Sequence, residues 1–282
     1  MKVIGVVANK QKDNEYVHTI MVLEKLIEKG FETVISQDID NSINLPVRFS
    51  DSLYEESDFV ICIGGDGTFL KVARQAYVFQ KPVLGINKGT VGFLAEVEVN
   101  DIDEAIDKLS RQEYRIEPRM VLKAKVFRNG EKVYEDIAIN DVVVSRAALS
   151  RIVNLKVSLD DKYVDTFPGD GIIVSTPTGS TGYTLSAGGP IIQPDMRLMI
   201  ISPICPHSLY SRSFIASEKR TVKINMDHKG ELSAMLTLDG QEGFKLKLGD
   251  EVYVETAEKD VLFASVTNYN FYDLLRAKLR TR

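Results

Sequence analysis

The sequence predicts a chain of two parts, an α/β domain built on a doubly wound, mostly parallel sheet and a larger β-rich domain of sandwich type. Over the first hundred residues, short apolar runs alternate with segments of helical periodicity, which is typical of strands joined by crossover helices. From about Met120 onward, short alternating segments are separated by turn signals, which favours antiparallel strands. The last stretch, Tyr269–Leu279, returns to helical periodicity. We therefore assign residues 1–99 to the first domain and 100–259 to the second, and we expect the C-terminal helix within 260–282 to join the first domain.

Apolar periodicity and glycine stop signals locate the elements of the first domain. Val17, Ile20, Leu23 and Ile27 recur at helical spacing, and Gly30 follows as a stop signal. Helices are expected at Tyr16–Lys29, from about Thr68 to Phe79, and at Asp101–Ser110. Strands are expected at Val3–Val7, Thr33–Ile35, Phe59–Ile63 and Pro82–Ile86. Ligands of doubly wound sheets bind beyond the carboxyl ends of the strands, so the segments after the last two strands are candidate site segments.

The second domain is expected to consist of strands in close succession. Turn signals such as Asn129-Gly130 and Lys229-Gly230 separate its apolar or alternating segments. The predicted strands are Val121–Phe127, Glu131–Ile139, Asp141–Val144, Leu155–Leu159, Ile172–Ser175, Val222–Asn225, Leu232–Leu238 and Glu251–Thr256.

The composition indicates an ordinary globular protein, with 282 residues of which 44% are hydrophobic and 27% charged. The net charge of -5 gives no electrostatic reason to expect nucleic acid or an anionic membrane as a partner. The apolar run at Met1–Val7 is too short for a signal peptide, and no stretch approaches membrane-spanning length, so we expect a soluble, cytoplasmic protein. Cys62 and Cys205 lie far apart in apolar runs, and we expect both to be buried, reduced thiols.

The most informative segment is Gly64–Thr68, which directly follows the apolar strand Phe59–Ile63 and precedes a helix. Its glycines let backbone N–H groups approach a bound group, and the positive end of the helix favours phosphate. Asp66 places one carboxylate in this turn, which is unusual unless it handles a proton or a metal. The alternative interpretation is a plain turn with Asp66 as the helix N-cap. Asn87-Lys88-Gly89 is expected at the same edge of the sheet.

A second segment, from Gly169 to Pro190, is rich in hydroxyl groups and glycines and carries no charge after Asp170. Small hydroxyl side chains and exposed backbone amides suit a sugar, a phosphate or a carboxamide. The alternative is a flexible loop, although Tyr183 and two prolines would stiffen this one.

Three further segments supply candidate residues. Asn140-Asp141 lies between two strand-like runs, where it is either a simple turn or a nucleoside reader, with the amide on the base and the carboxylate on ribose hydroxyls. His207 lies among prolines and small residues, which would give an exposed, fixed imidazole, although a lone histidine is more often structural. Gln241 ends the segment Asp239-Gly240-Gln241.

Taken in order, these segments resemble the NAD kinase family over nearly the whole chain. The resembling segments are Gly64–Thr68, Asn87–Leu94, Asn140-Asp141, Asp170-Gly171, Thr176–Tyr183, Ser186–Pro190, Ser202–Leu209 and Asp239-Gly240-Gln241. The first is shared with lipid kinases and phosphofructokinases, whereas Thr176–Tyr183 followed by Ser186–Pro190 is specific.

The resemblance implies ATP-dependent phosphorylation of NAD at the 2′-hydroxyl of its adenosine ribose, with Mg²⁺ or another divalent cation accompanying ATP. It implies NAD bound between the two domains, in a homodimer or homotetramer. Asp66 would be the catalytic carboxylate, and no residue is assigned as a metal ligand. The residues implied in binding NAD or ATP are Gly64, Gly65, Gly67, Thr68, Asn87, Asn140, Asp141, Asp170, Thr178, Thr181, Gly182, Tyr183, Ser186, His207 and Gln241.

The chain departs from the family pattern at three points. The family most often has Glu at the position of Asp141 and Ala at the position of Gly182. The Asp141 side chain is therefore one methylene shorter but keeps its charge, and Gly182 lacks a methyl group beside the dinucleotide. Phe167-Pro168-Gly169 lacks the Arg that some members carry two residues before Asp170-Gly171, and we hypothesise that this makes the site more tolerant of NADH.

Two other functions share part of this pattern. A lipid kinase would share Gly64–Thr68 but would need an apolar acceptor site, which the hydroxyl-rich Thr176–Tyr183 segment does not favour. A non-enzymatic NAD or NADP sensor would not need Asp66 beside phosphate. The phosphoryl donor, whether ATP, another triphosphate or polyphosphate, is left open by the sequence.

Overall fold

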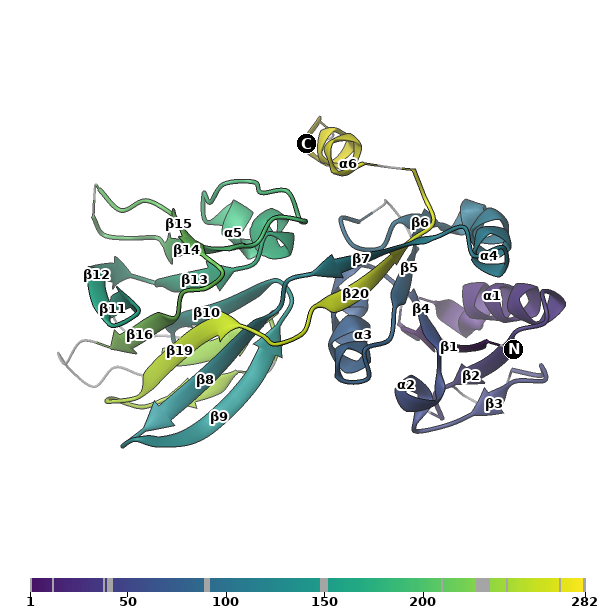
Figure 1. The fold of residues 1–282 in the computed structure, drawn as a ribbon, viewed down its shortest axis with the longest axis horizontal. Coiled ribbons are helices and arrows are strands. Elements are labelled where there is room, and N and C mark those ends of the chain that lie inside the picture. The colour runs from purple at the N-terminus through teal and green to yellow at the C-terminus, as the bar shows by residue number, and fades with distance from the viewer. Residues whose placement is uncertain are drawn as a thin grey trace. The chain divides into compact units, whose positions relative to one another are not determined.

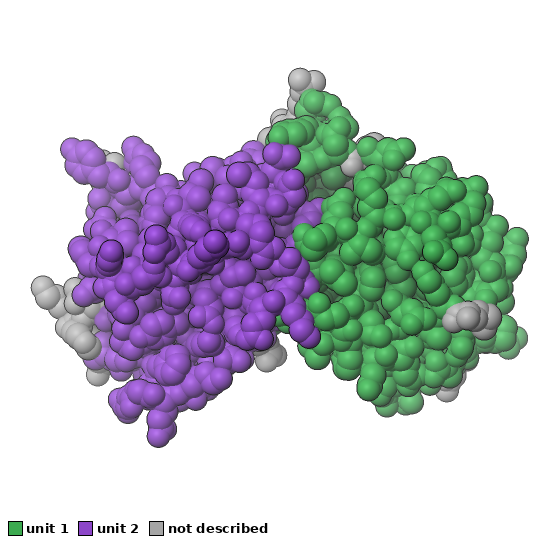
Figure 2. Space-filling model, viewed as in Figure 1, with its two compact units in different colours: residues 1–118, 261–282 green, residues 119–260 purple. Residues whose placement is uncertain are grey.

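The computed structural model describes residues 2–11, 13–37, 39, 43–88, 92–147, 152–208, 210–226, 234–241, 243–268 and 270–280. Contacts divide the chain into two compact units, which Figure 2 colours separately. Unit 1 comprises residues 1–118 and 261–282, and unit 2 comprises residues 119–260.

Unit 1 is built on an eight-stranded sheet in the order β3-β2-β1-β4-β5-β20-β7, with β6 also paired to β5 (Figure 1). Strand β1 is parallel to β2 and β4, and β5 is parallel to β4, β6 and β20. The strands are β1 Val3–Ala8, β2 Glu32–Ile35, β3 Arg48–Phe49, β4 Phe59–Ile63, β5 Val83–Asn87, β6 Val97–Glu98, β7 Arg115–Arg119 and β20 Val261–Ser265. Because β2 and β4 lie on opposite sides of β1, the strand order reverses between β1 and β4, and a ligand is expected beyond their carboxyl ends.

Helices cover both faces of this sheet. On one face, Leu26 of α1 and Ile106 of α4 share a buried cluster with Ile61 and Ile86 of the sheet. On the other face, the ring of Phe69 in α3 meets the ring of Phe263 edge-on, with 4.8 Å between centroids. The helical segments of unit 1 are η1 Asn14–Tyr16, α1 Val17–Glu28, α2 Leu53–Glu56, α3 Asp66–Val78, η2 Val99–Asp101, α4 Ile102–Ser110 and α6 Phe271–Arg280.

The first unit extends beyond residue 99, the limit assigned from the sequence. Helix α4 and strand β7 belong to it because α4 packs on α1 and β7 joins its sheet. Ion pairs Lys25–Asp103 at 3.6 Å and Lys29–Asp107 at 2.6 Å also tie α4 to α1. These contacts join segments about 80 residues apart in the chain, which local composition does not reveal.

Unit 2 contains two six-stranded antiparallel sheets in the orders β15-β14-β13-β10-β17-β18 and β12-β11-β16-β19-β8-β9. Side chains of both sheets, such as Val142 and Val144 of one and Ala124 and Val254 of the other, meet in one buried cluster. The elements are β8 Leu122–Arg128, β9 Glu131–Ala138, β10 Asp141–Arg146, β11 Val153–Leu159, β12 Lys162–Gly169, β13 Gly171–Ser175, η3 Thr178–Thr181, α5 Tyr183–Ser186, β14 Leu198–Ile204, β15 Phe214–Ser217, β16 Val222–Met226, β17 Ala234–Leu238, β18 Phe244–Leu246 and β19 Glu251–Thr256.

The alternation along β10 explains where the hydroxyl-rich segment packs. Val142 and Val144 face the core between the sheets, whereas Val143 joins Ile173 and Ile204 in a cluster on the opposite face. Ala187, directly after α5, packs against this second cluster. Segment η3–α5 is therefore seated on the outer face of the β10–β13–β14 sheet.

Several sequence expectations are corrected by the structure. Cys62 is buried in β4, but Cys205 is exposed, because it lies just beyond the end of β14 rather than inside a strand. Strands β3, β6, β7, β12, β14, β15, β18 and β20 were not predicted. Residues Lys162–Asp165 of β12 are exposed, and β18 has three residues, so neither carries a strong period-two pattern. Lys229-Gly230, a predicted turn, and residues 232–233 of a predicted strand lie outside the described residues.

No helix in the described ranges is both long enough and apolar enough to cross a membrane.

Candidate active site

The turn Gly64–Thr68 lies at the switch point between β1 and β4. Gly64 follows β4 and its N–H donates to the carbonyl of Ile86 at 2.9 Å. A methyl group on Gly64 would come within 2.7 Å of the Thr68 side chain, so this position requires glycine. Asn9 follows β1, and its Nδ2 donates to Thr68 Oγ1 at 3.2 Å. Sequence reasoning missed Asn9, because its place beside Thr68 depends on the pairing of β1 with β4.

Asp66 is the first residue of α3, and Gly65 rather than Asp66 is its N-cap. The Asp66 carboxylate instead accepts three backbone N–H groups from a loop between β5 and β6. Phe93 donates to Oδ2 at 3.0 Å, and Leu94 and Ala95 donate to Oδ1 at 3.2 and 3.3 Å. A methyl group on Gly92 would overlap this carboxylate, so the loop approaches Asp66 more closely than a residue with a side chain allows. Three amide donors fix the orientation of Asp66 and compensate its negative charge.

The other candidate residues of unit 1 lie in the first turn of α3 or at the same carboxyl edge of the sheet. Gly67 is in the first turn of α3, and a methyl group there would meet no atom within 4 Å. Asn87 is the last residue of β5, at the same carboxyl edge, and is 5% exposed. The helix contributes free N–H groups at its N-terminus, which is a favourable place for phosphate oxygens.

In unit 2, Asn140 lies in the turn between β9 and β10, Asp141 begins β10, and Asp239 holds both. One carboxylate oxygen of Asp239 accepts the N–H groups of Asn140 at 2.7 Å and Asp141 at 3.1 Å, and the other accepts that of Ile139 at 2.8 Å. The N–H of Asp239 donates to the carbonyl of Asp141 at 2.9 Å. Gln241 Nε2 in turn donates to the carbonyl of Asp239 at 3.2 Å.

Asp141 is a buried carboxyl group with a shifted pKa. It is 5% exposed. Burial raises its pKa to about 7, and the neighbouring charge of Asp239 contributes to the rise. A group with this pKa changes its charge near neutral pH, which is a frequent property of functional sites.

Segment Thr176–Tyr183 packs directly on the Asn140-Asp141 turn. Thr176 Oγ1 donates to the carbonyl of Ile139 at 2.6 Å, and the N–H of Thr176 donates to the carbonyl of Asn140 at 2.9 Å. A methyl group on Gly179 would overlap the Asn140 carbonyl oxygen, whereas one on Gly182 would lie 3.6 Å from Asn140 Nδ2 and 3.9 Å from Asp141 Oδ2. The structure thus brings Gly182 next to both side chains.

Two polar atoms of this group are buried without a hydrogen-bond partner in the described structure, Asn140 Oδ1 and Thr178 Oγ1. Buried polar atoms are nearly always paired, and each exception needs an explanation. A bound ligand that donates hydrogen bonds at this turn would supply the missing partners.

Asp170 lies where the chain passes from β12 in one sheet to β13 in the other. Its N–H donates to the carbonyl of Ile204 at 2.9 Å, and its carboxylate pairs with Arg146 Nε at 2.8 Å. Sequence reasoning missed Arg146, which reaches Asp170 from the end of β10. Tyr183 is 46% exposed. Partial burial raises the pKa of Tyr183, and the charges of Cys205, Asp170 and Asp141 raise it further.

The remaining candidates are at the edge of this group. Thr181 Oγ1 donates to the carbonyl of Thr178 at 3.4 Å, and Ser186 is exposed at the end of α5. His207 is exposed, and its N–H donates to the carbonyl of Pro168 at 2.7 Å, which fixes its backbone. Among the residues described, no group of three or more His, Cys, Asp or Glu side chains is arranged to hold a metal ion.

Comparison with protein families gives two matches that follow one another along the chain. Residues 4–114 match the ATP-NAD kinase N-terminal domain, and residues 139–266 match the ATP-NAD kinase C-terminal domain. Similar curated proteins include an NAD kinase of Acetivibrio thermocellus, 42% identical over 99% of this chain and 97% of its own. An NAD kinase of Caldanaerobacter subterraneus subsp. tengcongensis is 40% identical, with 100% of both chains covered.

Two solved structures share the fold. Yeast NADH kinase complexed with NADH gives a TM-score of 0.90 at 22% identity, covering 100% of this chain and 88% of its own. An NAD kinase from Archaeoglobus fulgidus in complex with ATP gives a TM-score of 0.78 at 24% identity, covering 99% of each chain. The family matches and the curated relatives, together with a glycine-rich turn that carries one carboxylate, identify a phosphotransferase. The chain belongs to the NAD kinase family.

Proposed function

We propose that this protein transfers the γ-phosphoryl group of ATP to the 2′-hydroxyl of the adenosine ribose of NAD, giving NADP. The observation that carries the assignment of roles is the placement of Asp66, a carboxylate oriented by three backbone amides at the N-terminus of α3 and at the switch point of the sheet. A sugar hydroxyl is a weak nucleophile at neutral pH, and a positioned carboxylate that accepts or orients its proton contributes about 10² to 10⁴-fold.

The triphosphate would be held by backbone amides of the turn Gly65–Thr68. The Thr68 N–H donates to the carbonyl of Gly65 at 2.9 Å, so the N–H groups of Gly65, Asp66 and Gly67 are the ones offered to phosphate, and the open space at Gly67 leaves room for its oxygens. Mg²⁺ would enter with the triphosphate, because this ion prefers phosphate oxygens and water to an all-protein site. When bound, it would neutralise part of the charge that develops on the transferred group.

The dinucleotide would be read by unit 2. Asn140 would hydrogen-bond the adenine and Asp141 the ribose hydroxyls, with Thr178, Gly182 and Tyr183 beside them. The unpaired Asn140 Oδ1 and Thr178 Oγ1 support this assignment, since a nucleoside supplies N–H and O–H donors. Asp170, Thr181, Ser186, His207 and Gln241 would complete the site.

The experiment that tests the reaction is direct. Purified protein is incubated with Mg-ATP and NAD, NADP is followed through a coupled dehydrogenase, and the position of the new phosphate is read by phosphorus NMR. We expect a 2′-phosphate on the adenosine ribose. Phosphorylation of lipid vesicles with none of NAD would favour the lipid kinase, and tight NAD binding with no turnover would favour the sensor.

Two finer assignments rest on the sequence, the location on its apolar runs and the assembly on the family resemblance. We infer that the protein acts in the cytoplasm and assembles as a homodimer or homotetramer. Light scattering on the purified protein measures the oligomeric state directly.

The preference between NAD and NADH is tested by the same coupled assay with each acceptor, and we expect NADH to be accepted.

A further inference from the structure

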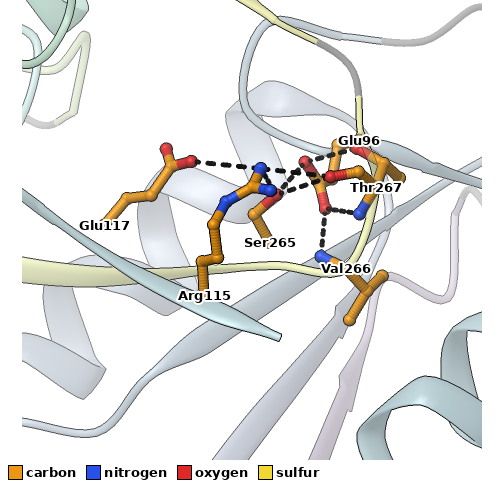
Figure 3. Close-up of polar contacts among 6 residues, drawn as sticks. All are labelled: Glu96, Arg115, Glu117, Ser265, Val266 and Thr267. Carbon is orange, nitrogen blue, oxygen red and sulfur yellow. Dashed lines mark hydrogen bonds and ion pairs between the residues drawn. The ribbon is translucent and has the colours of Figure 1, made fainter. Parts of the chain in front are cut away.

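Glu96 directly follows the loop that holds Asp66, and its carboxylate binds a different part of the chain. Figure 3 shows this carboxylate surrounded by groups from the end of β20 and the residues after it. Oε1 accepts the N–H groups of Val266 at 2.7 Å and Thr267 at 3.2 Å. Oε2 accepts the hydroxyls of Ser265 and Thr267, each at 3.0 Å. Four donors therefore converge on one carboxylate, and hydrogen bonds to an ionised group are roughly twice as strong as neutral ones.

The loop 92–95 is thus held at both of its sides. On one side its N–H groups at Phe93, Leu94 and Ala95 bind the Asp66 carboxylate. On the other side the next residue, Glu96, binds Ser265–Thr267. Ala95 is 1% exposed, and its Cα would lie 2.7 Å from a methyl group on Gly85. The loop is packed against β5 between its two anchors.

A basic residue completes the second anchor from β7. Arg115 Nη2 donates to Ser265 Oγ at 3.2 Å and to the carbonyl of Thr267 at 3.1 Å (Figure 3). Arg115 Nη2 also forms an ion pair with Glu117 Oε1 at 3.8 Å. Among the six residues of Figure 3, Glu117 is joined only to Arg115 and lies at the outer edge of the group. The segment that binds Glu96 is therefore itself fixed to the sheet.

We propose that Glu96 is a positioning residue for the catalytic carboxylate: by fixing loop 92–95 to Ser265–Thr267, it sets the three amides that orient Asp66. This inference rests on the proposed role of Asp66. A carboxylate that must meet a hydroxyl oxygen in line with a phosphoryl group tolerates little displacement, and a misplacement of about 1 Å from a distant change can cost about 10²-fold in rate.

The test compares Glu96→Gln with Glu117→Gln, which removes the same charge at the outer edge of the same cluster. Glutamine keeps the size of the side chain but offers one acceptor oxygen in place of two. We expect Glu96→Gln to lower kcat by about 10- to 100-fold while KM for NAD stays within about twofold, because the residues assigned to the dinucleotide lie in unit 2. Glu117→Gln should match the parent protein. An unchanged kcat in Glu96→Gln would overturn the proposal.

A double-mutant cycle distinguishes positioning from general damage to the fold. If Glu96 acts through Asp66, then Glu96→Gln should cause little further loss in an Asp66→Asn background. An equal loss in both backgrounds would overturn the proposal and leave Glu96 a structural residue. Full activity of Asp66→Asn itself would instead remove Asp66 from the mechanism, and absence of NAD phosphorylation by the parent protein would remove the proposed function; both are separate outcomes.

Hydrogen exchange of the peptide containing Phe93–Ala95 gives a readout that does not depend on activity. Asp66→Asn and Glu96→Gln should each increase exchange in this peptide, whereas Glu117→Gln should not. Protection of these amides that is unchanged in Glu96→Gln would overturn the proposal even where the residual turnover of the double mutant is too slow to measure.

Discussion

The carboxylate of Asp239 accepts the N–H of Asp141 at 3.1 Å, and the N–H of Asp239 donates to the carbonyl of Asp141 at 2.9 Å. The end of β17 and the turn before β10 are therefore joined by reciprocal bonds. The same Asp239 side chain also fixes Ile139 and Asn140, so one carboxylate determines the backbone of the whole turn.

We predict that Asp239→Asn weakens binding of NAD more than it slows the chemical step. The amide nitrogen of Asn would replace one acceptor, leaving one backbone N–H of the turn unpaired at a cost of about 1–3 kcal/mol. KM for NAD should rise by about tenfold or more with a smaller change in kcat, as measured by steady-state kinetics. Asp195→Asn, an exposed position in the same unit, is the matched control. A normal KM in Asp239→Asn would show that the turn is set without it.

The raised pKa of Asp141 predicts how stability depends on pH. Its pKa is about 7 in the folded protein against an ordinary value of 3.8, so between these values the folded state holds a proton that the unfolded state has lost. This group therefore lowers the free energy of unfolding as pH rises from about 4 to about 7, with no further loss above that. A shift of this size corresponds to at most about 4 kcal/mol.

Asp141→Asn removes this titration. We expect the variant to be more stable than the parent at pH 8, with the advantage shrinking toward pH 5, in thermal melts at both pH values. The same variant should bind NAD more weakly, because an ionised acceptor for ribose hydroxyls is lost. An advantage in stability that is equal at pH 5 and pH 8 would contradict the assignment of this pKa.

Two glycines three residues apart should respond differently to alanine. A methyl group on Gly179 would overlap the Asn140 carbonyl, whereas Gly182 has its nearest neighbours at 3.3 Å or more and a φ of −94°. Gly179→Ala should therefore disrupt the turn and abolish NAD binding. Gly182→Ala should melt within about 2 °C of the parent, because its methyl group would meet only the Gly179 carbonyl oxygen closely, at 3.3 Å, and a small shift relieves that contact at a cost of less than about 0.5 kcal/mol. Calorimetry and NAD titration check both, and a folded, NAD-binding Gly179→Ala protein would refute the packing described above.

Gly67→Ala tests the phosphate site without disturbing the fold. The free protein has room for the methyl group, and alanine favours a helix over glycine by about 1 kcal/mol. Thermal stability should stay equal or rise, while KM for ATP increases, because the methyl group would occupy space assigned to phosphate. KM for ATP unchanged in a stable variant would place the triphosphate elsewhere.

The sequence was sufficient to select the candidate segments whose composition is informative by itself. Gly64–Thr68 follows an apolar strand and precedes a helix, and Thr176–Tyr183 combines hydroxyls with glycines, so both could be predicted from neighbouring residues. Asn9, Glu96 and Asp239 could not be given roles in this way. Their partners are 59, 170 and 98 residues away, and such contacts depend on which strands become neighbours in the sheet.

The same reason explains the limits of the fold prediction. Alternating strands and helices gave the class of each unit, since periodicity is a local property. The return of β20 to the first sheet beside β5 and the packing of α4 on α1 are long-range pairings, and no nearby residue signals them. Cys205 was expected to be buried because the apolar run before it continues up to Ile204, where the strand ends.

The most direct test is the kcat of Asp66→Asn with NAD and Mg-ATP, measured beside the affinity for NAD by calorimetry. The substitution keeps the shape of the side chain and removes the charge that faces Phe93, Leu94 and Ala95. We predict that kcat falls by about 10² to 10⁴-fold while the affinity for NAD changes by less than about threefold, a free-energy change of under about 0.7 kcal/mol. A kcat equal to that of the parent protein would contradict the central role of Asp66.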